Sequence, residues 1–285
     1  MGDDSPDDNS TEVINKLASQ TGVRIHYVKN TPPLGQNDNT NSLYDLVTTS
    51  HLILLHDDDL LLPNSIEDLL SCWSAHPRLT AAYGKQYVIS HEGAVDLHGS
   101  LSLNNAYART ADRQGLQPND WETGILQQFP NDGFMILASA AKSVRWRSRE
   151  VVGGGGEFDF GLRLGLIHRG FYFLNEYTAK YRKTESGSIS GSKSDNAALY
   201  SYRLLLEAQL PHAAEQLRSR RLREIAPRAL MQAINCRKLG QAWDIYWSSN
   251  HGWRGRMSPG GVRRLLFMLI AWARHSKSRG AVNLS

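Results

Sequence analysis

The stretch LILLHDDDLLLPN, which runs from Leu52 to Asn64, combines an apolar run, three consecutive aspartates and a helix start. The apolar run predicts a buried strand over 51–56, and the Pro-Asn pair predicts a helix over 65–75 capped by Asn64. Ligand sites in open α/β sheets lie at the carboxyl ends of strands. Carboxylates packed at such a place repel one another unless a cation shares them. The stretch therefore predicts an α/β domain with a cation site.

The geometry of the aspartates favours a metal site, although a solvated acidic turn that caps the next helix is the alternative. Asp57 and Asp59 are two positions apart. On an extended backbone their side chains would point the same way. Two such oxygens fit one hard divalent ion, Mg²⁺ or Mn²⁺, and leave coordination positions for phosphate oxygens.

Strands alternate with helices on both sides of this stretch, which predicts a layered, mostly parallel sheet. A Gly/Ser-rich segment over 186–194 precedes an Ala/Leu/Arg-rich pattern that is helical from about residue 196. The expected helices cover 11–19, 41–49, 65–75 and 159–169, and the expected strands cover 23–28, 51–56, 81–90, 134–138 and 172–175.

The composition excludes several classes of protein. Of the 285 residues 41% are hydrophobic, which is enough for a sizeable core and argues against a mainly disordered chain. Cys72 and Cys236 lie far apart, which excludes a disulfide scaffold and a multi-cysteine zinc site. The longest strongly apolar run, 265–273, is shorter than the ~20 residues of a membrane span. The acidic first residues do not resemble a secretory signal, so we expect a cytoplasmic protein.

The net charge of +4 conceals an asymmetry. Residues 1–70 contain 3 Lys/Arg and 12 Asp/Glu, whereas residues 201–285 contain 15 Lys/Arg and 4 Asp/Glu. The acidic end fits a cation site and the basic end fits an anionic surface, so the high pI does not indicate a nucleic-acid partner.

Asp57-Asp58-Asp59 followed by Pro63 resembles the DxD region of glycosyltransferase family 2, the inverting nucleotide-sugar transferases of the GT-A fold. Other segments agree in order and spacing over about residues 1–190: GDDSPDD at 2–8, LG at 34–35 with NTN at 39–41, GGGGEFDFGLRL at 153–164, and YR at 181–182 with Ser188 and Ser190. The resemblance implies a GT-A domain over 1–190 and a helical region over 191–285. It also implies a bacterial enzyme of polysaccharide biosynthesis, which passes a sugar from a nucleotide-diphosphate donor to a glycan or lipid-linked acceptor.

The resemblance assigns roles to individual residues. Asp57 and Asp59 would hold Mn²⁺ or Mg²⁺, and Asp58 would assist them or contact the ribose. The remaining donor contacts would come from Asp4 at the nucleobase, from Asn41, and from Arg182 (or the adjacent Lys183) at the diphosphate.

The general base is expected six residues before Arg163, which is Glu157. Asp159 is the rival, and for both acids a helix N-terminus that favours negative charge is the alternative explanation. The sequence departs from the family pattern in having Glu157 where aspartate is usual, Gly156 where glutamate is common, and Thr184 where histidine is frequent.

The front of the chain also departs from the family. The apolar first strand and helix that precede the acidic "DDxS" segment are not seen here, so roughly thirty residues of the family layout are expected to be missing. One alternative function is therefore a catalytically impaired nucleotide-sugar-binding protein. Another is a different divalent-metal enzyme, such as a phosphohydrolase.

The segment VRRLLFMLIAWAR, residues 262–274, has an apolar run bracketed by arginines. This composition predicts a helix in an anionic membrane interface, which would place the protein on the inner face of the cell membrane. A helix packed against the catalytic domain is an equally weighted alternative.

Overall fold

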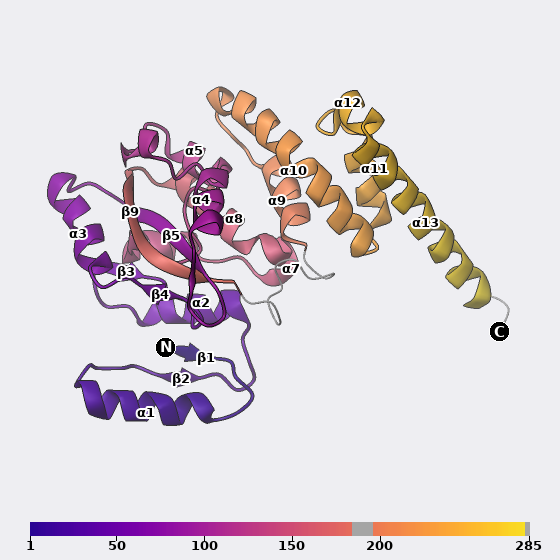
Figure 1. Ribbon diagram of the computed structural model, residues 1–285. Helices are drawn as coiled ribbons and strands as arrows, with labels where there is room; N and C mark the ends of the chain where they lie inside the picture. The colour runs from indigo at the N-terminus through magenta and orange to yellow at the C-terminus, as the bar shows by residue number, and fades with distance from the viewer. Residues whose placement is uncertain (184–195, 283–285) are drawn as a thin grey trace.

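The computed structural model describes the backbone of residues 1–183 and 196–282, and side chains up to Ala273. The first part is a small unit in which two short parallel strands pair beside a helix (Figure 1). Its elements, together with the helix that follows, are β1 (Gly2–Asp3), α1 (Asn9–Thr21), β2 (Val28–Lys29) and α2 (Gln36–Leu46). The strand expected over 23–28 is much shorter than predicted, because only its end has a partner in β1.

The main sheet has the strand order β3-β8-β5-β9-β4, with β6 paired to β5 and β7 paired to β9. Strands β3, β5 and β9 point the same way, since β8 is antiparallel to both β3 and β5, and β9 is parallel to β5. The strands are β3 (His51–Ile53), β4 (Leu60–Leu61), β5 (Ala81–Ile89), β6 (Val95–Asp96), β7 (Gly115–Leu116), β8 (Phe134–Leu137) and β9 (Phe171–Arg182).

The two sheets are separate within the described residues: β1 pairs with β2 alone and β3 with β8 alone. Helix α2 connects them, and the side-chain amide of Asn39 donates a hydrogen bond to the carbonyl of Gly2 at 3.0 Å. The expected absence of a first strand and helix stays a prediction.

Helices cover both faces of the main sheet. Alternate residues of β5 point to opposite sides, with Tyr83 in a core against α6 and α8 and Ala82 in a core against α3. Phe134 and Met135 divide between the two cores in the same way. The helices here are α3 (Ser65–Ala75), α4 (Leu97–Ala106), α5 (Asp120–Ile125), α6 (Ala138–Val144), α7 (Arg149–Val152) and α8 (Gly156–Ile167).

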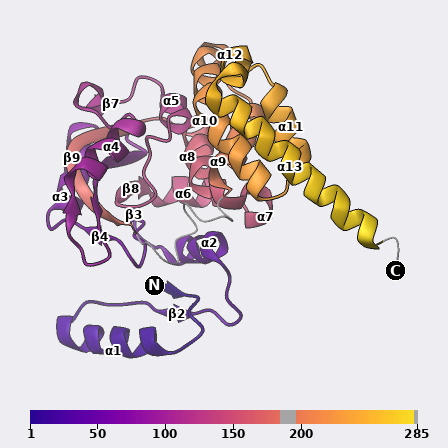
Figure 2. The same ribbon diagram turned by 45° about the vertical axis from the view of Figure 1, so that its right-hand side comes forward.

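The helical C-terminal region packs against α5 and α8 (Figures 1 and 2). One apolar core joins Ile125 and Leu162 of the α/β part to Leu205, Leu230 and Met268 of the later helices. These helices are α9 (Ala197–Glu207), α10 (Glu215–Asn235), α11 (Leu239–Trp247), α12 (Gly252–Met257) and α13 (Pro259–Val282). The predicted α/β class with a helical C-terminal region is confirmed.

Helix α13 packs against the other C-terminal helices, and its contact with a membrane stays a prediction. Met268 is buried against the neighbouring helices, so one face is packed. Much of the remaining surface of the helix is exposed and carries Val262, Leu266, Phe267, Leu269, Ile270 and Trp272. Within the described residues, every helix is too short or too polar to cross a bilayer.

Candidate active site

The three aspartates lie in a turn three residues after β3, because the strand expected over 51–56 ends at Ile53. The backbone N–H of Asp59 donates to the carbonyl of His56 at 3.4 Å, and residues 57 and 58 form the corner. This turn brings ligand atoms of His56, Asp58 and Asp59 within 4.8 Å of one another. Asp57 is exposed and is not part of this group. The expectation that Asp57 and Asp59 face the same way assumed an extended backbone, and the turn changes which side chains converge.

Asp59 is the fixed member of the group. Its side chain is 1% exposed, and its Oδ1 accepts a 2.7 Å hydrogen bond from the backbone N–H of Arg182. Its Oδ2 lies 3.8 Å from Nδ1 of His56. Asp59 Oδ2 and His56 Nε2 are buried, and apart from the hydrogen bond between the carboxyls of Asp59 and Asp132 they have no partner among the described residues. Buried polar atoms are nearly always satisfied, so this set of carboxylate and imidazole ligands fits a divalent cation.

The guanidinium of Arg182 holds the turn in place. Its Nε donates to the carbonyl of Asp58 at 2.8 Å, and its Nη1 donates to the carbonyls of Ser90 and His91. The side chain thus connects the aspartate turn to the end of β5. Ser188 and Ser190 of the same motif lie outside the described residues.

A buried polar network beneath the turn was not predicted as a unit. Gln86 donates to the carboxylate of Asp132 and to Asn131, and accepts a 2.7 Å hydrogen bond from Arg109. Asp132 is fully buried, and burial together with a hydrogen bond to the carboxyl of Asp59 raises its pKa. Burial lowers the pKa of Arg109 to about 10. Arg109 lies in no recognisable motif, so the sequence carried no signal for it.

Glu157 lies in the first turn of α8, exposed at its surface but with enough protein around its carboxyl for burial to affect it. Its surroundings raise its pKa: burial is the main cause, the charge of Asp59 adds to it, and His56 and Arg109 oppose it. These partners show that Glu157 lies near the aspartate turn, although they are about a hundred residues apart in sequence. A carboxyl with a raised pKa beside a candidate metal site is a candidate proton acceptor.

Asp159 occupies a different environment. Its side chain is 3% exposed, and its Oδ2 accepts hydrogen bonds from Nε of Arg147 at 3.0 Å and Nε of Arg163 at 2.8 Å. Arg163 also donates to the carbonyls of Val144 and Arg145. Asp159 therefore ties α8 to the segment that follows α6, and its oxygens are engaged by arginines.

The glycine run before Glu157 serves packing against α9. Gly153 has a φ of +53°, and a Cβ there would lie 2.4 Å from the ring of Tyr200. The N–H of Gly154 donates to Asn196 at 2.7 Å. The sequence suggested a ligand or a positive φ at this run, and the structure shows the positive φ together with a close helix.

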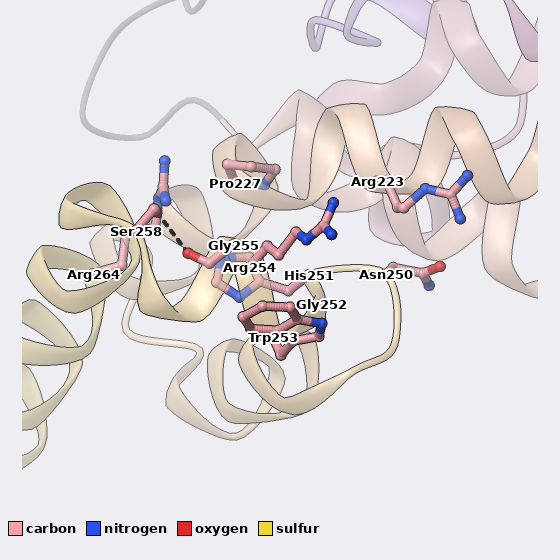
Figure 3. Close-up of a pocket in the computed structure, with 10 residues that line it drawn as sticks. All are labelled: Arg223, Pro227, Asn250, His251, Gly252, Trp253, Arg254, Gly255, Ser258 and Arg264. Atoms are coloured by element: carbon pink, nitrogen blue, oxygen red, sulfur yellow. Dashed lines mark hydrogen bonds between the residues drawn. The ribbon is translucent and has the colours of Figure 1, made fainter.

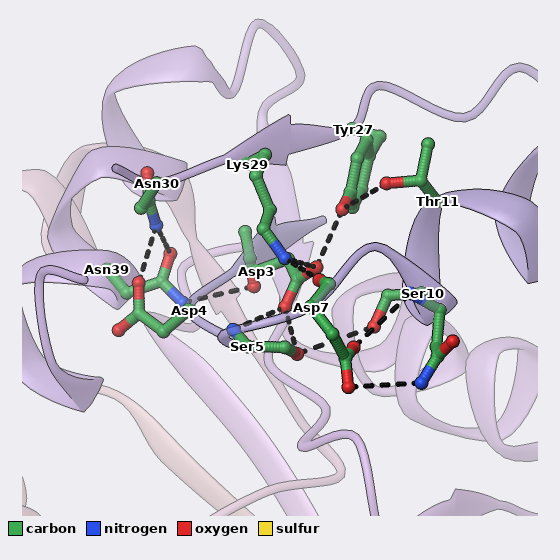
Figure 4. A network of polar contacts seen from close by, with 12 residues as sticks. Asp3, Asp4, Ser5, Asp7, Ser10, Thr11, Tyr27, Lys29, Asn30 and Asn39 are labelled. Carbon is green, nitrogen blue, oxygen red and sulfur yellow. Dashed lines mark hydrogen bonds and ion pairs between the residues drawn. The ribbon is translucent and has the colours of Figure 1, made fainter. Parts of the chain in front are cut away.

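Asp4 and Asn41 bind protein groups in the structure. Asp4 accepts hydrogen bonds from Asn30 at 2.9 Å and from the backbone N–H of Leu34 and Gly35, which fixes the loop before α2 (Figure 4). Asn41 donates to and accepts from the backbone of Trp146, both at 2.8 Å. Their contacts with a donor stay predictions.

The chain has an α/β fold of the GT-A type, and comparisons with known proteins agree with it. Residues 1–134 match the profile of glycosyl transferase family 2, which confirms the resemblance seen in the motifs. Curated protein sequences gave no match.

Among solved structures, TarS residues 1–349 from S. aureus in complex with UDP is similar with a TM-score of 0.59 and 12% identity, over 98% of this chain and 81% of that one. A mannosyltransferase from Pyrobaculum calidifontis in complex with GDP-Man and Mn²⁺ gives 0.54 and 10%, over 96% and 76%. At these identities the likeness shows the fold.

Proposed function

We propose that the protein transfers a sugar from a nucleotide-diphosphate donor to a glycan or lipid-linked acceptor, with inversion at the anomeric carbon and with a divalent cation. The observation that carries the proposal is that the carboxyl of Glu157 lies close enough to His56 and Asp59 of the aspartate turn for their charges to shift its pKa. The candidate base, Glu157, then lies near the turn that is the candidate site for the diphosphate.

The donor side would be held by the turn. His56, Asp58 and Asp59 would bind Mn²⁺ or Mg²⁺, and Asp57 is retained as a further candidate. Such an ion neutralises the charge that develops on a departing diphosphate. Arg182 would support this side through the turn, while Asp4 and Asn41 would shape the nucleotide pocket by fixing the loop and segment that they bind.

Glu157 would act on the acceptor. As an acceptor hydroxyl attacks the anomeric carbon, its proton passes to the carboxylate of Glu157. The new C–O bond forms on the face opposite the bond to the diphosphate, which breaks in the same step, so the configuration inverts. Asp159 is the weaker candidate because Arg147 and Arg163 occupy its oxygens.

The proposal also covers the domain organisation of the chain and its location in the cell. A GT-A domain would cover 1–190 and a helical region 191–285, with the protein in the cytoplasm and its last helix against the inner face of a membrane. The exposed apolar face of α13 supports this contact.

The test measures binding and turnover separately. UDP and GDP are titrated by calorimetry with Mn²⁺ and with EDTA, and hydrolysis of their sugar derivatives is followed as slow transfer to water. Metal-dependent binding with hydrolysis supports the proposal. Metal-dependent binding without hydrolysis or transfer identifies an impaired binding protein, and no nucleotide binding in Mn²⁺ contradicts the assignment.

A further inference from the structure

The helical C-terminal region contains a pocket of 620 Å³ that shares no residue with the candidate active site (Figure 3). It lies where α10, α12 and α13 meet and is lined by side chains from all of them. The polar residues that matter for its chemistry are Arg223, Asn250, His251, Arg254, Ser258 and Arg264.

The pocket is strongly electropositive. Arg223, Arg254 and Arg264 come from three different helices, and in the described part of the chain none of them has an ion-pair partner. The sequence from 245 to 285 contains no aspartate or glutamate that could neutralise them. Unpaired cations around one space repel each other, and a bound anion would remove that repulsion.

His251 gives an independent indication of a ligand. His251 is only 6% exposed, and apart from a hydrogen bond with the backbone of Tyr246 its ring nitrogens have no partner among the described residues. Burial and the nearby charges of Arg264 and Arg256 lower the pKa of His251, and the hydrogen bond with Tyr246 opposes this shift. A buried polar group without a partner is rare in folded proteins, and an anion oxygen would satisfy it.

The surroundings of the pocket are apolar. Trp253 lines it and is 65% exposed, and Met257 in the same short helix is 74% exposed. The exposed apolar face of α13 begins beside them at Val262. Basic groups next to exposed tryptophan and aliphatic side chains are typical of sites that take a phosphate whose attached group is apolar.

We propose that this pocket binds a phosphate group, which three arginines and His251 hold by charge-assisted hydrogen bonds. The phosphate can come from the headgroup of an anionic lipid or from a small phosphate ester. Both sources present the same oxygens to the arginines, and the exposed Trp253 favours the lipid. The site is distinct from the proposed catalytic site and does not depend on its activity.

The experiment compares the full chain with the double variant Arg254→Gln, Arg264→Gln. A control with the same change in net charge, Arg220→Gln with Arg237→Gln, alters exposed arginines outside the pocket. Glycerol 3-phosphate is titrated by calorimetry, and co-sedimentation is measured with vesicles of phosphatidylglycerol in phosphatidylcholine. Each lost arginine should weaken phosphate binding by about tenfold, and the control should bind normally.

The two arms distinguish the sources. Saturable binding of glycerol 3-phosphate that only the pocket variant loses supports a site for small esters. Binding to vesicles alone, lost by the pocket variant and kept by the control, supports a lipid headgroup. No saturable binding in either arm, or equal loss in both double variants, overturns the proposal. Melting by circular dichroism checks folding, and the exposed Arg254→Gln alone answers the question if the double variant is destabilised.

Discussion

The aspartate turn and the C-terminal pocket both bring charged side chains of one sign together, acidic at the turn and basic in the pocket. At the turn, carboxylates and an imidazole converge on one small space, with a buried network behind them. In the pocket, arginines from three helices surround a wider, open space beside an apolar surface. The chain thus gathers acidic groups at one site and basic groups at another, and we propose a cation as the ligand of the first and an anion as the ligand of the second.

The two regions also differ in how their charges are held. Arg182 and backbone groups fix the aspartate turn through several hydrogen bonds. The pocket arginines have no such bonds in the described structure, apart from the contact of Arg254 with the ring of Trp253 at 5.5 Å. We therefore expect sharp effects of single substitutions at the turn and graded, salt-sensitive effects at the pocket.

The largest effect is expected at Glu157. General-base assistance contributes ~10²–10⁴-fold, so Glu157→Gln should reduce the transfer rate by about that factor while the affinity for the nucleotide stays nearly unchanged. Single-turnover rates and calorimetric affinities measure the two quantities. Normal turnover in Glu157→Gln together with an inactive, folded Asp159→Asn would move the base to Asp159.

The pH profile gives the next effect. Because the surroundings raise the pKa of Glu157, the carboxyl is protonated, and unable to accept a proton, up to a higher pH than an ordinary glutamate. The value of kcat/KM should fall about tenfold per pH unit below that pKa and level off above it. A profile that stays flat down to the ordinary glutamate range of ~4.3 would show that this carboxyl is not the base.

Asp159→Asn should act on stability. The change removes a buried charge that Arg147 and Arg163 share, and a hydrogen bond to a charged group contributes ~1.5–3 kcal/mol. We expect the free energy of unfolding to fall by about 2 kcal/mol in urea, with Asp45→Asn, whose ion pair with Arg145 is exposed, as a control that changes little. Equal stability of the two variants would contradict the positioning role.

Substitutions of the three aspartates should differ in their effect on metal-dependent nucleotide binding. Asp59→Asn and Asp58→Asn should weaken Mn²⁺-dependent binding of a nucleoside diphosphate by about tenfold, because each removes a charged ligand. Asp57→Asn should have a smaller effect, since its side chain is outside the group. Unchanged metal-dependent affinity in all three variants would exclude this site, and a dominant effect of Asp57→Asn would mean that the turn rearranges around the ion.

The smallest effect is expected on α13. Leu266 and Ile270 are about half exposed on its open face, so changing both to glutamine should reduce co-sedimentation with anionic vesicles several-fold without disturbing the buried Met268. The matched control changes Leu97 and Leu101, which are exposed on α4. Equal sedimentation of the two variants and the unchanged protein would favour a helix whose role is packing.

The sequence by itself determined the elements whose signals are local. The helix Ser65–Ala75 forms where the apolar spacing predicted it, with Asn64 at its N-cap position but without the expected side-chain cap hydrogen bond, and the buried strands at 81 and 134 begin as expected. The motifs also placed the aspartates after a strand and the acids of α8 at a helix start. The apolar periodicity of an element depends on residues that are close in sequence, so an element predicted from it does not require contacts with distant residues.

Tertiary contacts decided the start of α2. Asparagine disfavours helices by bonding to its own backbone, and this part of the chain was expected to be a loop until residue 41. In the structure the helix begins at Gln36, because Asn37, Asn39 and Asn41 bond instead to the backbone of Arg147, Gly2 and Trp146. Each partner is distant in sequence, so no local rule could include it.

Tertiary structure also decided how the site acids divide their roles. An alternating backbone would have paired Asp57 with Asp59, but the turn closed by Arg182 pairs Asp58 with Asp59 and His56. Glu157 and Asp159 differ by two positions on one helix, which turns them about 200° apart. Glu157 then lies near the aspartate turn, and Asp159 faces Arg147 and Arg163. The sequence determined that these acids occur at a strand end and a helix start, and the three-dimensional neighbours determined which of them are open to a ligand.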